Sequence, residues 1–269
     1  MASFSVVSNI ASANAQSNLH GTQLGLQKAL TRLSSGFRIN MSGDDAAGLA
    51  VANSYRAEVA VITQGIRNAN DGLSDLQIKD GALNNISTLL DRLSTLATQA
   101  ASGTTTDESR ATLQLEVDAV ITEIDREATV AGLDTATGFS VFVSNEAVTT
   151  NGVVSGTVNQ ITVADLGLTA LDIDDIDAAK TAVATIADAV VTLGETQGSI
   201  GTIQNRLQFA ISLAQSQQVN TKAAESRIRD ANVAEESANM TRFNILTQSG
   251  IAALAQANQA SSSVLSLLR

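Results

Sequence analysis

The chain contains no cysteine and a single histidine among its 269 residues. Without cysteine it can form no disulfide, no thiolate nucleophile and no Cys-ligated zinc, haem or iron–sulfur site. One histidine excludes the H-E-x-x-H zinc motif and any site built from several histidines. No acidic residue, cysteine or second histidine lies near His20 in the sequence, so we interpret it as a structural or surface residue. We therefore expect no enzyme activity, no catalytic residue, no cofactor and no metal site.

Proline is also absent, and aromatic residues make up only 3% of the chain. Average usage would include about 5% proline. Proline breaks helix interiors, because it lacks the N–H and clashes with the carbonyl four residues earlier. Few aromatic side chains suit thin helix-on-helix packing by Ala, Leu, Ile and Val. The composition favours long, closely packed helices over a compact α/β enzyme.

The charge balance is acidic, with 16 Lys and Arg against 27 Asp and Glu and a net charge of −11. Such a balance argues against nucleic acid binding through phosphate neutralisation. The sequence has no run of about 18 apolar residues, so we expect no membrane span. Residues 1–5 lack a basic region and an apolar core, and we expect no secretory signal peptide there.

Apolar residues recur every three or four positions in several long stretches, which predicts amphipathic helices. If the second stretch is unbroken, it would span on the order of 80 Å. Gly36 fits a helix C-cap, and Ser42-x-x-Asp45 and Thr105-x-x-Glu108 fit capping boxes at helix starts. The stretches are 15–37, 44–100, 105–131, 183–214 and 243–267.

Residues 134–176 differ in composition from the rest of the chain. They are rich in Thr, Val, Gly and Asn, and alternating β-branched residues with the Asn151-Gly152 pair predict strands and hairpins. Acidic residues gather in and after this segment, whereas none precedes Asp44 and none follows Glu236. We expect the acidic middle to face water.

The two ends of the chain are amphipathic and poor in charge. A long helix of Ala, Ser, Asn and Gln with one weak apolar stripe cannot bury enough area alone to offset its ordering entropy. Each end therefore needs a partner, which we expect to be the other end of the same chain and the ends of neighbouring copies. This pattern points to assembly rather than catalysis.

Several blocks at both ends resemble the bacterial flagellin family. The resemblance covers about residues 1–130 and 180–269, in order, and is more specific than one short motif. The matching blocks are LSSGFRIN at 33–40, DDAAGLA at 44–50, IRNANDG at 66–72, SRIRDA at 226–231, LAQANQ at 254–259 and SVLSLLR at 263–269.

The resemblance implies a mainly α fold, with long antiparallel helices and a coiled coil formed by the N- and C-terminal regions and a small β-hairpin-rich middle. Thr137-Gly138-Phe139 departs from the family's Phe-Asn-Gly-type turn before its first hairpin. Ala260-Ser261 stands where the family often has proline, which should keep the last helix straight. The implied parts are an inner coiled-coil domain of 1–43 and 230–269, an outer-packed helical bundle of 44–133 and 177–229, and a short surface-exposed β-like segment at 134–176.

The same resemblance implies a structural subunit that polymerises into the flagellar filament used for swimming. Implied partners are copies of the chain itself, a flagellar export chaperone, the type III export apparatus, the filament cap and hook-associated proteins. The implied location is extracellular, in the filament. One alternative is the hook–filament junction protein of the same superfamily, against which the full C-terminal match argues. A chemoreceptor-like hairpin would need a membrane span or sensor module, and a metallopeptidase-bearing flagellin would need H-E-x-x-H.

Residues of the terminal helices are the candidates for subunit packing. These are Leu26, Leu30, Leu33, Phe37, Phe243, Leu246, Ala253, Ala257, Val264 and Leu267. Candidates for polar interdomain or intersubunit contacts are Arg38, Asp44, Asp45, Arg227, Arg229 and Asp230, with exposed pairs of little energetic weight as the alternative.

Paired carboxylates could in principle act as an acid pair or cation site. For Asp44 and Asp45 we favour helix N-capping, and for Asp174 and Asp175 a solvated run. The resemblance also implies candidate recognition by the vertebrate Toll-like flagellin receptor, with packing between subunits as the alternative. The matching positions are Arg92, Leu96 and Glu116, whereas Asp91 and Thr95 depart from the family pattern.

Overall fold

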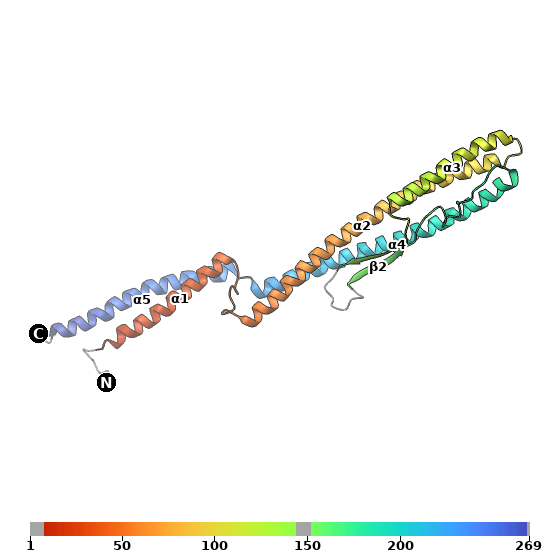
Figure 1. The fold of residues 1–269 in the computed structure, drawn as a ribbon. Coiled ribbons are helices and arrows are strands. Elements are labelled where there is room, and N and C mark those ends of the chain that lie inside the picture. Colours follow the sequence, from red (N-terminus) through yellow and green to blue (C-terminus); the bar gives the residue numbers. More distant parts are fainter. Residues whose placement is uncertain (1–7, 144–151, 268–269) are drawn as a thin grey trace. The chain divides into compact units, whose positions relative to one another are not determined.

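The computed structural model describes residues 8–143 and 152–267, with side chains through residue 259. Long helices dominate, and one antiparallel pair of strands joins them, so the predicted mainly α fold is confirmed (Figure 1). The elements are α1 Ile10–Ser35, α2 Ala46–Ala100, α3 Asp107–Val130, β1 Thr137–Phe142, β2 Val153–Val158, α4 Ile176–Arg229 and α5 Val233–Leu267.

The chain divides into two compact units. Unit 1 comprises residues 1–57 and 220–269, and therefore contains α1 and α5. Unit 2 comprises residues 58–219, with α3, both strands and most of α2 and α4. Unit 1 thus combines the two ends of the chain, whereas unit 2 is one continuous stretch.

In unit 1, α1 and α5 lie side by side and antiparallel (Figure 1). Asn9 donates from Nδ2 to the Ala257 carbonyl at 3.0 Å, near the two chain ends. At the opposite end of the pair, Arg32 Nη1 lies 2.9 Å from Glu236 Oε1. Asn9 also caps α1, because its side chain accepts from the Ser12 N–H at 3.0 Å.

Gly36 ends α1 in the left-handed conformation, with φ of 74°. Its N–H donates to the Arg32 carbonyl at 2.9 Å. Glycine adopts this conformation without the steric cost that a Cβ imposes, so the predicted C-cap is confirmed.

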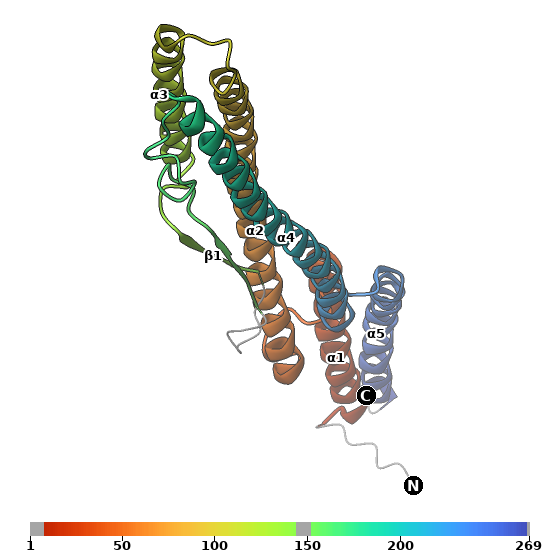
Figure 2. The ribbon, with the colours of Figure 1, turned by 90° about the vertical axis from the view of Figure 1, so that its right-hand side faces the viewer.

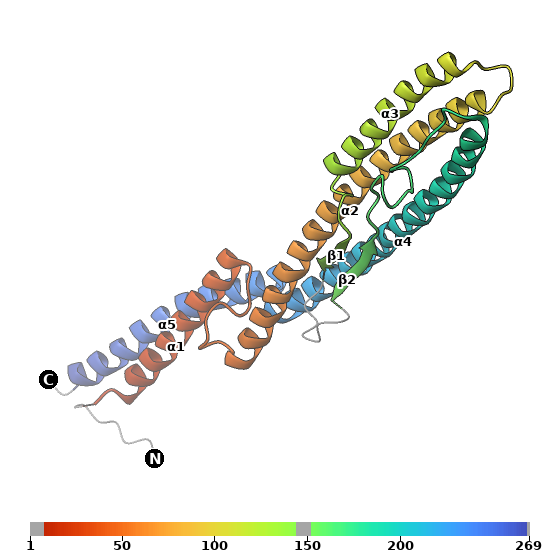
Figure 3. The same ribbon diagram turned by 45° about the vertical axis from the view of Figure 1, so that its right-hand side comes forward.

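In unit 2, α3 and α4 run beside α2 (Figure 3), and the three helices share one apolar core. Two side-chain contacts define the antiparallel register of α2 and α4. Gln197 Nε2 donates to Asn84 Oδ1 at 3.3 Å, and Gln218 Nε2 donates to Thr63 Oγ1 at 2.6 Å. Fully buried side chains of this core include Leu83, Leu90 and Leu93 of α2, Ile124 of α3, and Ile200 and Leu207 of α4.

The strand pair β1–β2 confirms the predicted hairpin and lies against α2 and α4 (Figures 2 and 3). Asn151, of the predicted turn, lies outside the described residues. Gly72 of α2 leaves room for the ring of Phe139, and Gly156 of β2 leaves room for Ile203 of α4. Arg206 of α4 donates from Nη1 to the Ser155 carbonyl at 2.7 Å.

We expected residues 134–176 to face water, but part of the loop after β2 is buried. Its apolar side chains Ile161, Leu168 and Ile173 are fully buried in the core of unit 2. Two contacts fix its backbone: the Ile161 N–H donates to the Leu133 carbonyl at 2.8 Å, and the Ile173 N–H donates to Gln114 Oε1 at 2.9 Å. The apolar residues are irregularly spaced, so periodicity does not reveal them.

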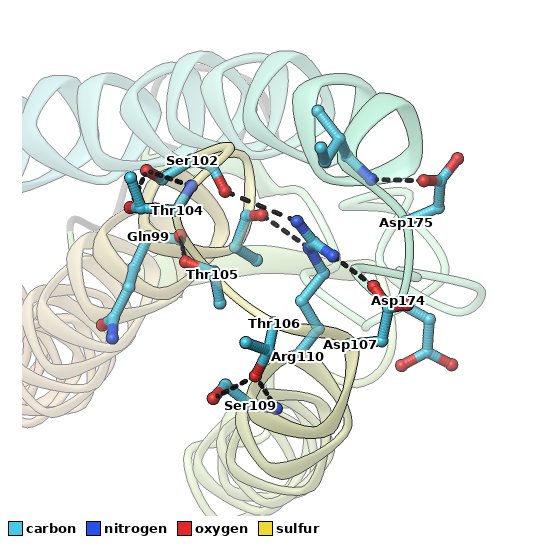
Figure 4. Close-up of polar contacts among 12 residues, drawn as sticks. Gln99, Ser102, Thr104, Thr105, Thr106, Asp107, Ser109, Arg110, Asp174 and Asp175 are labelled. Atoms are coloured by element: carbon cyan, nitrogen blue, oxygen red, sulfur yellow. Dashed lines mark hydrogen bonds and ion pairs between the residues drawn. The ribbon is translucent and has the colours of Figure 1, made fainter.

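The turn between α2 and α3 is organised around Arg110, which is only 4% exposed (Figure 4). Its guanidinium donates to the Ala100 carbonyl at 3.0 Å and to the Ser102 carbonyl at 3.4 Å, at the end of α2. It also pairs with Asp107 at 2.6 Å, in the first turn of α3. These bonds satisfy carbonyls that a helix end leaves without partners.

The cap of α3 is shifted by one residue from the sequence prediction. Thr106 is the N-cap, and its side chain accepts from the Ser109 N–H at 3.4 Å. Thr105, which we expected to cap, instead donates from Oγ1 to the Gln99 carbonyl at 2.8 Å (Figure 4). A hydroxyl can satisfy either helix end, so the capping motif alone does not distinguish the two threonines.

Candidate functional site

Two short connections meet in unit 1, one between α1 and α2 and one between α4 and α5. The Arg38 N–H donates to the Arg229 carbonyl at 2.7 Å, and the Ala231 N–H donates to the Gly36 carbonyl at 2.9 Å. Phe37 and Asp230 form an isolated antiparallel bridge. Backbone hydrogen bonds therefore join the N-terminal and C-terminal parts of the chain at this junction.

Arginine side chains reinforce the junction. The Arg229 guanidinium carbon lies 4.1 Å from the centroid of the Phe37 ring, a cation–π contact that contributes about 0.5–2 kcal/mol depending on its exposure. Arg38 donates from Nη2 to the Ile228 carbonyl at 2.8 Å. Asp230 accepts from the Ser226 hydroxyl at 2.5 Å, whereas Arg227 is exposed. Of the six polar candidates, Arg38, Arg229 and Asp230 thus belong to one cluster within unit 1.

Asp44 and Asp45 hold the connection between α1 and α2. The Asp44 carboxylate lies 3.0 Å from Lys28 Nζ and accepts from the backbone N–H groups of Asn40 and Met41 at 3.2 and 3.4 Å. Asp45 directly precedes α2 and accepts from the Gly48 N–H at 2.9 Å. Asp45 is therefore the N-capping residue, whereas Asp44 fastens the loop to α1.

The contacts of Asp44 predict a pH dependence for unit 1. The hydrogen bond from Lys28, assisted by those from Asn40 and Met41, lowers the pKa of the Asp44 carboxyl below its ordinary value, although burial opposes this. The unfolded chain then takes up this proton at a higher pH than the folded chain. The stability that these contacts contribute is therefore present above the ordinary Asp range and is lost as pH falls through the lowered pKa.

Replacing Lys28 by methionine should move the pKa of Asp44 back toward its ordinary value, because the largest cause of the shift is removed. An NMR pH titration of the side-chain carboxyl measures this directly. The Lys180→Met variant is the control, because Lys180 pairs with Asp177 in unit 2 and does not contact Asp44. Unchanged titration of Asp44 in the Lys28→Met chain would contradict the assignment.

A groove of about 500 Å³ lies between α1 and the loop fastened by Asp44. Lys28 and Arg32 line it from α1, and Met41 and Asp44 line it from the loop. Met41 is 58% exposed, and Leu24 of the same groove is 54% exposed. The groove thus combines apolar and charged surface on the outside of the terminal pair.

The predicted packing residues of the terminal helices divide by exposure. Leu26, Leu33, Phe37, Phe243 and Ala257 are half-buried, while Leu30, Leu246 and Ala253 are exposed. The side chains of Val264 and Leu267 lie outside the described side chains. The sequence prediction missed Ala29, the buried residue of α1, because it followed the larger apolar residues of the stripe.

Gly25 explains how α1 and α5 approach so closely. A Cβ at this position would lie 2.6 Å from the ring of Phe243, so only glycine leaves room for that ring. Gly250 plays a similar part on α5, where a Cβ would lie 3.1 Å from Leu19. Gly25 was not singled out from the sequence, whereas Gly250 lies on the apolar stripe of the predicted helix 243–267, whose small residues favour close helix contact.

The residues of the candidate receptor site lie on α2 and α3. Arg92 pairs with Glu116 through two hydrogen bonds of 2.8 and 2.5 Å on the surface. Leu96 is 1% exposed and belongs to the core of unit 2. Arg92 and Glu116 thus lie together on the surface, whereas Leu96 is buried and is not part of that surface.

The remaining sequence candidates have local roles. His20 is exposed on α1, and Asp174 and Asp175 are exposed before α4, where Asp175 accepts from the Ile176 N–H at 2.7 Å (Figure 4). Among the described residues, no three His, Asp or Glu side chains gather closely enough to hold a metal ion. Within the same residues, no helix combines the length and apolar character that a membrane crossing requires.

The fold and the junction define a helical protein whose two chain ends pair with each other. The sequence profile of the bacterial flagellin N-terminal helical region matches residues 6–140, and that of the C-terminal helical region matches residues 183–268. On this evidence, and on the relatives below, the chain belongs to the bacterial flagellin family.

Relatives match almost the entire chain. The flagellar filament 33 kDa core protein of Treponema phagedenis is 37% identical, over 97% of this chain and 98% of its own. A flagellin of Halalkalibacterium halodurans is 36% identical, with the same coverage of 97% and 98%. A crystal structure of Bacillus cereus flagellin is similar with a TM-score of 0.48 and 27% identity, over 59% of this chain and 94% of that one.

Proposed function

We propose that this chain is a structural subunit that polymerises into the bacterial flagellar filament. The observation that carries the proposal is the thin packing of the terminal pair. Among the described side chains, Ala29 is the one fully buried residue of α1, and α5 buries no apolar side chain to that extent. Two helices this long cannot offset their ordering entropy with so small a shared core, so copies of the chain must supply the rest.

The exposed side chains of the pair support this assignment. Leu30 is 47% exposed on α1, and Ile245 and Ile251 are 59% and 56% exposed on α5. These side chains are available for contacts between copies of the chain, where their burial would contribute a favourable free energy. Because the surfaces on α1 and α5 differ, a contact between them is head-to-tail, which generates an open filament when the rotation does not close.

The proposal includes the finer assignments that follow from a filament role. The chain is no enzyme, works outside the cell, and depends on a flagellar export chaperone, the type III export apparatus, the filament cap and hook-associated proteins. Residues 1–43 and 230–269 form the inner coiled coil, and residues 44–133 and 177–229 form the outer bundle. The relatives named flagellin and filament core protein favour this role over the hook–filament junction.

For the polar residues, we propose that the cluster of Arg38, Arg229 and Asp230 keeps the terminal pair aligned for contacts between subunits. A receptor that recognises the chain would contact the exposed Arg92–Glu116 pair, because Leu96 is buried. Subunit packing competes for the same surface.

Seeded polymerisation followed by negative-stain electron microscopy tests the proposal. The full chain should form filaments, whereas a chain lacking residues 237–269 should stay soluble and unpolymerised, because α1 then has no partner helix. Circular dichroism should show that the truncated chain keeps the helices of unit 2. Filaments of normal stability from the truncated chain, or none from the full chain, would refute the proposal.

A further inference from the structure

The contact rows of α1 and α5 have the spacing of an antiparallel coiled coil. On each helix, a row of buried and half-buried positions alternates three and four residues apart. We call these rows the α1 seam and the α5 seam; both helices are labelled in Figure 1. The α1 seam is Ser12, Ala15, Leu19, Thr22, Leu26, Ala29 and Leu33, and the α5 seam is Glu236, Met240, Phe243, Thr247, Gly250, Leu254 and Ala257.

Apolar packing leaves two registers of this pair open. Phe243 lies over Gly25, where a Cβ would be 2.6 Å from the ring. Gly21 is one turn earlier on α1, and among the described residues no other side chain lies within 4 Å of a Cβ built on it. Movement of α5 by one turn, about 6 Å, would therefore bring the ring over a second glycine. The two seams would again face each other, because both repeat every three or four residues.

Charged residues distinguish the two registers. Glu236 is the one charged residue of the two seams, is only 8% exposed, and pairs with Arg32 Nη1 at 2.9 Å. Lys28 lies one turn before Arg32 on α1, but its Nζ is 3.0 Å from Asp44 in the loop before α2. In the observed register each carboxylate therefore has its own cation. In the shifted register Glu236 would face Lys28, and the two carboxylates would compete for that cation.

The Arg32–Glu236 pair favours one register more than it stabilises the helices. Arg32 Nε is buried and has no hydrogen-bond partner among the described residues, so the pair leaves one donor unsatisfied. A buried ion pair of this kind contributes little net stability, because desolvation of both charges offsets their attraction. Removal of one partner is nevertheless costly, since it leaves the other charge buried alone. This asymmetry lets a polar contact fix the register of a coiled coil.

We propose that Arg32 and Glu236 are positioning residues that fix the register of α1 against α5, with Asp44 keeping Lys28 from taking the place of Arg32. The inference concerns contacts within one copy of the chain, so it stands separately from the filament assignment. It predicts that loss of the Arg32 guanidinium shifts α5 by one turn, so that Glu236 pairs with Lys28.

Engineered disulfides can report the register, because the natural chain has no cysteine. A Cβ at position 250 lies 3.8 Å from the Leu19 Cβ, which is the usual distance in a disulfide. The chain with Leu19→Cys and Gly250→Cys therefore forms the observed-register disulfide. The chain with Ala15→Cys and Gly250→Cys forms the shifted-register disulfide, because Ala15 lies one turn before Leu19. Both are oxidised as dilute full-length chains, and the intrachain product is measured by its mobility on a non-reducing gel.

Arg32→Met should exchange the two products. The yield of the observed-register disulfide should fall about tenfold or more, and that of the shifted-register disulfide should rise by a similar factor. Addition of Lys28→Met should abolish this rise, because the shifted register then offers Glu236 no cation. The matched control is Arg242→Met, which removes an exposed arginine of α5 and should leave both yields unchanged. Circular dichroism should show that every variant keeps the helices of unit 2.

Two results would overturn the inference. If Arg32→Met left the yield of the observed-register disulfide unchanged, the backbone bonds of the junction would suffice to hold the register. If that yield fell without a rise of the shifted-register disulfide that depends on Lys28, Arg32 would stabilise the pair without selecting its register.

Discussion

Replacing Arg110 by methionine is expected to lower the free energy of unfolding of unit 2 by about 3 kcal/mol. Methionine keeps an unbranched stem but donates no hydrogen bond. The carbonyls of Ala100 and Ser102 then lose their donors at a buried helix end. Urea denaturation followed by circular dichroism measures the loss, and the turn between α2 and α3 should lose amide-exchange protection first.

Two controls separate the parts of this effect. Asp107→Asn removes the charge partner of Arg110, but the Asp107 side chain is 95% exposed, so its ion pair should contribute little. Arg126→Met removes an arginine that pairs with Glu123 and Glu127 on the surface of α3, and it should unfold at the wild-type midpoint. If Arg110→Met also unfolded at that midpoint, the capping role assigned to Arg110 would be wrong.

Gly65→Ala is expected to destabilise the docking of the hairpin on α2, by about 1–3 kcal/mol. The new Cβ would clash with the backbone carbonyl oxygen of Val143. A backbone atom cannot rotate away as the end of a flexible side chain can. Alanine favours the helix by about 1 kcal/mol over glycine, so propensity alone would predict the opposite sign. The steric term decides, because a backbone clash can be relieved only by moving the strand.

Gly81→Ala tests whether sterics or propensity governs each position. Gly81 lies in the same helix, is exposed, and has no atom within 4 Å of a Cβ built on it. Here the substitution should stabilise the chain by about 1 kcal/mol. Both variants are measured by urea denaturation, with amide exchange in β1 and β2 as the local readout. Stabilisation by both substitutions would show that the hairpin does not depend on the recess at Gly65.

Local patterns explain which features the sequence predicts well. The Gly36 cap and the hairpin depend on residues close together in the chain, and both are confirmed. The capping residue of α3 was predicted one position early, because Thr105 and Thr106 are chemically equivalent and only their surroundings distinguish them. The Ser42-x-x-Asp45 motif predicted the start of the second helix three residues early, since Asp45 is the capping residue of α2. Of the predicted capping pair, Asp44 instead contacts Lys28, which requires the loop to fold back on α1.

The buried loop 159–175 illustrates what a single sequence does not reveal. Its Thr and Asp content is typical of a surface segment, yet Ile161, Leu168 and Ile173 are buried. Hydrogen bonds with Leu133 and Gln114 position them, and these partners are distant in the chain. The composition of a segment describes all of its residues together. Burial depends on the few residues that contact other elements, and composition does not identify them.

The sequence by itself determined the long helices and the family. Helices follow from the absence of proline and from apolar spacing, both of which act within a few residues, and the family follows from motifs at both ends. Only the tertiary structure decided which glycines pack against another element, which arginine is buried and which side chains of α4 stay exposed. These properties depend on contacts between residues far apart in the chain, and a residue's type does not state what will lie against it.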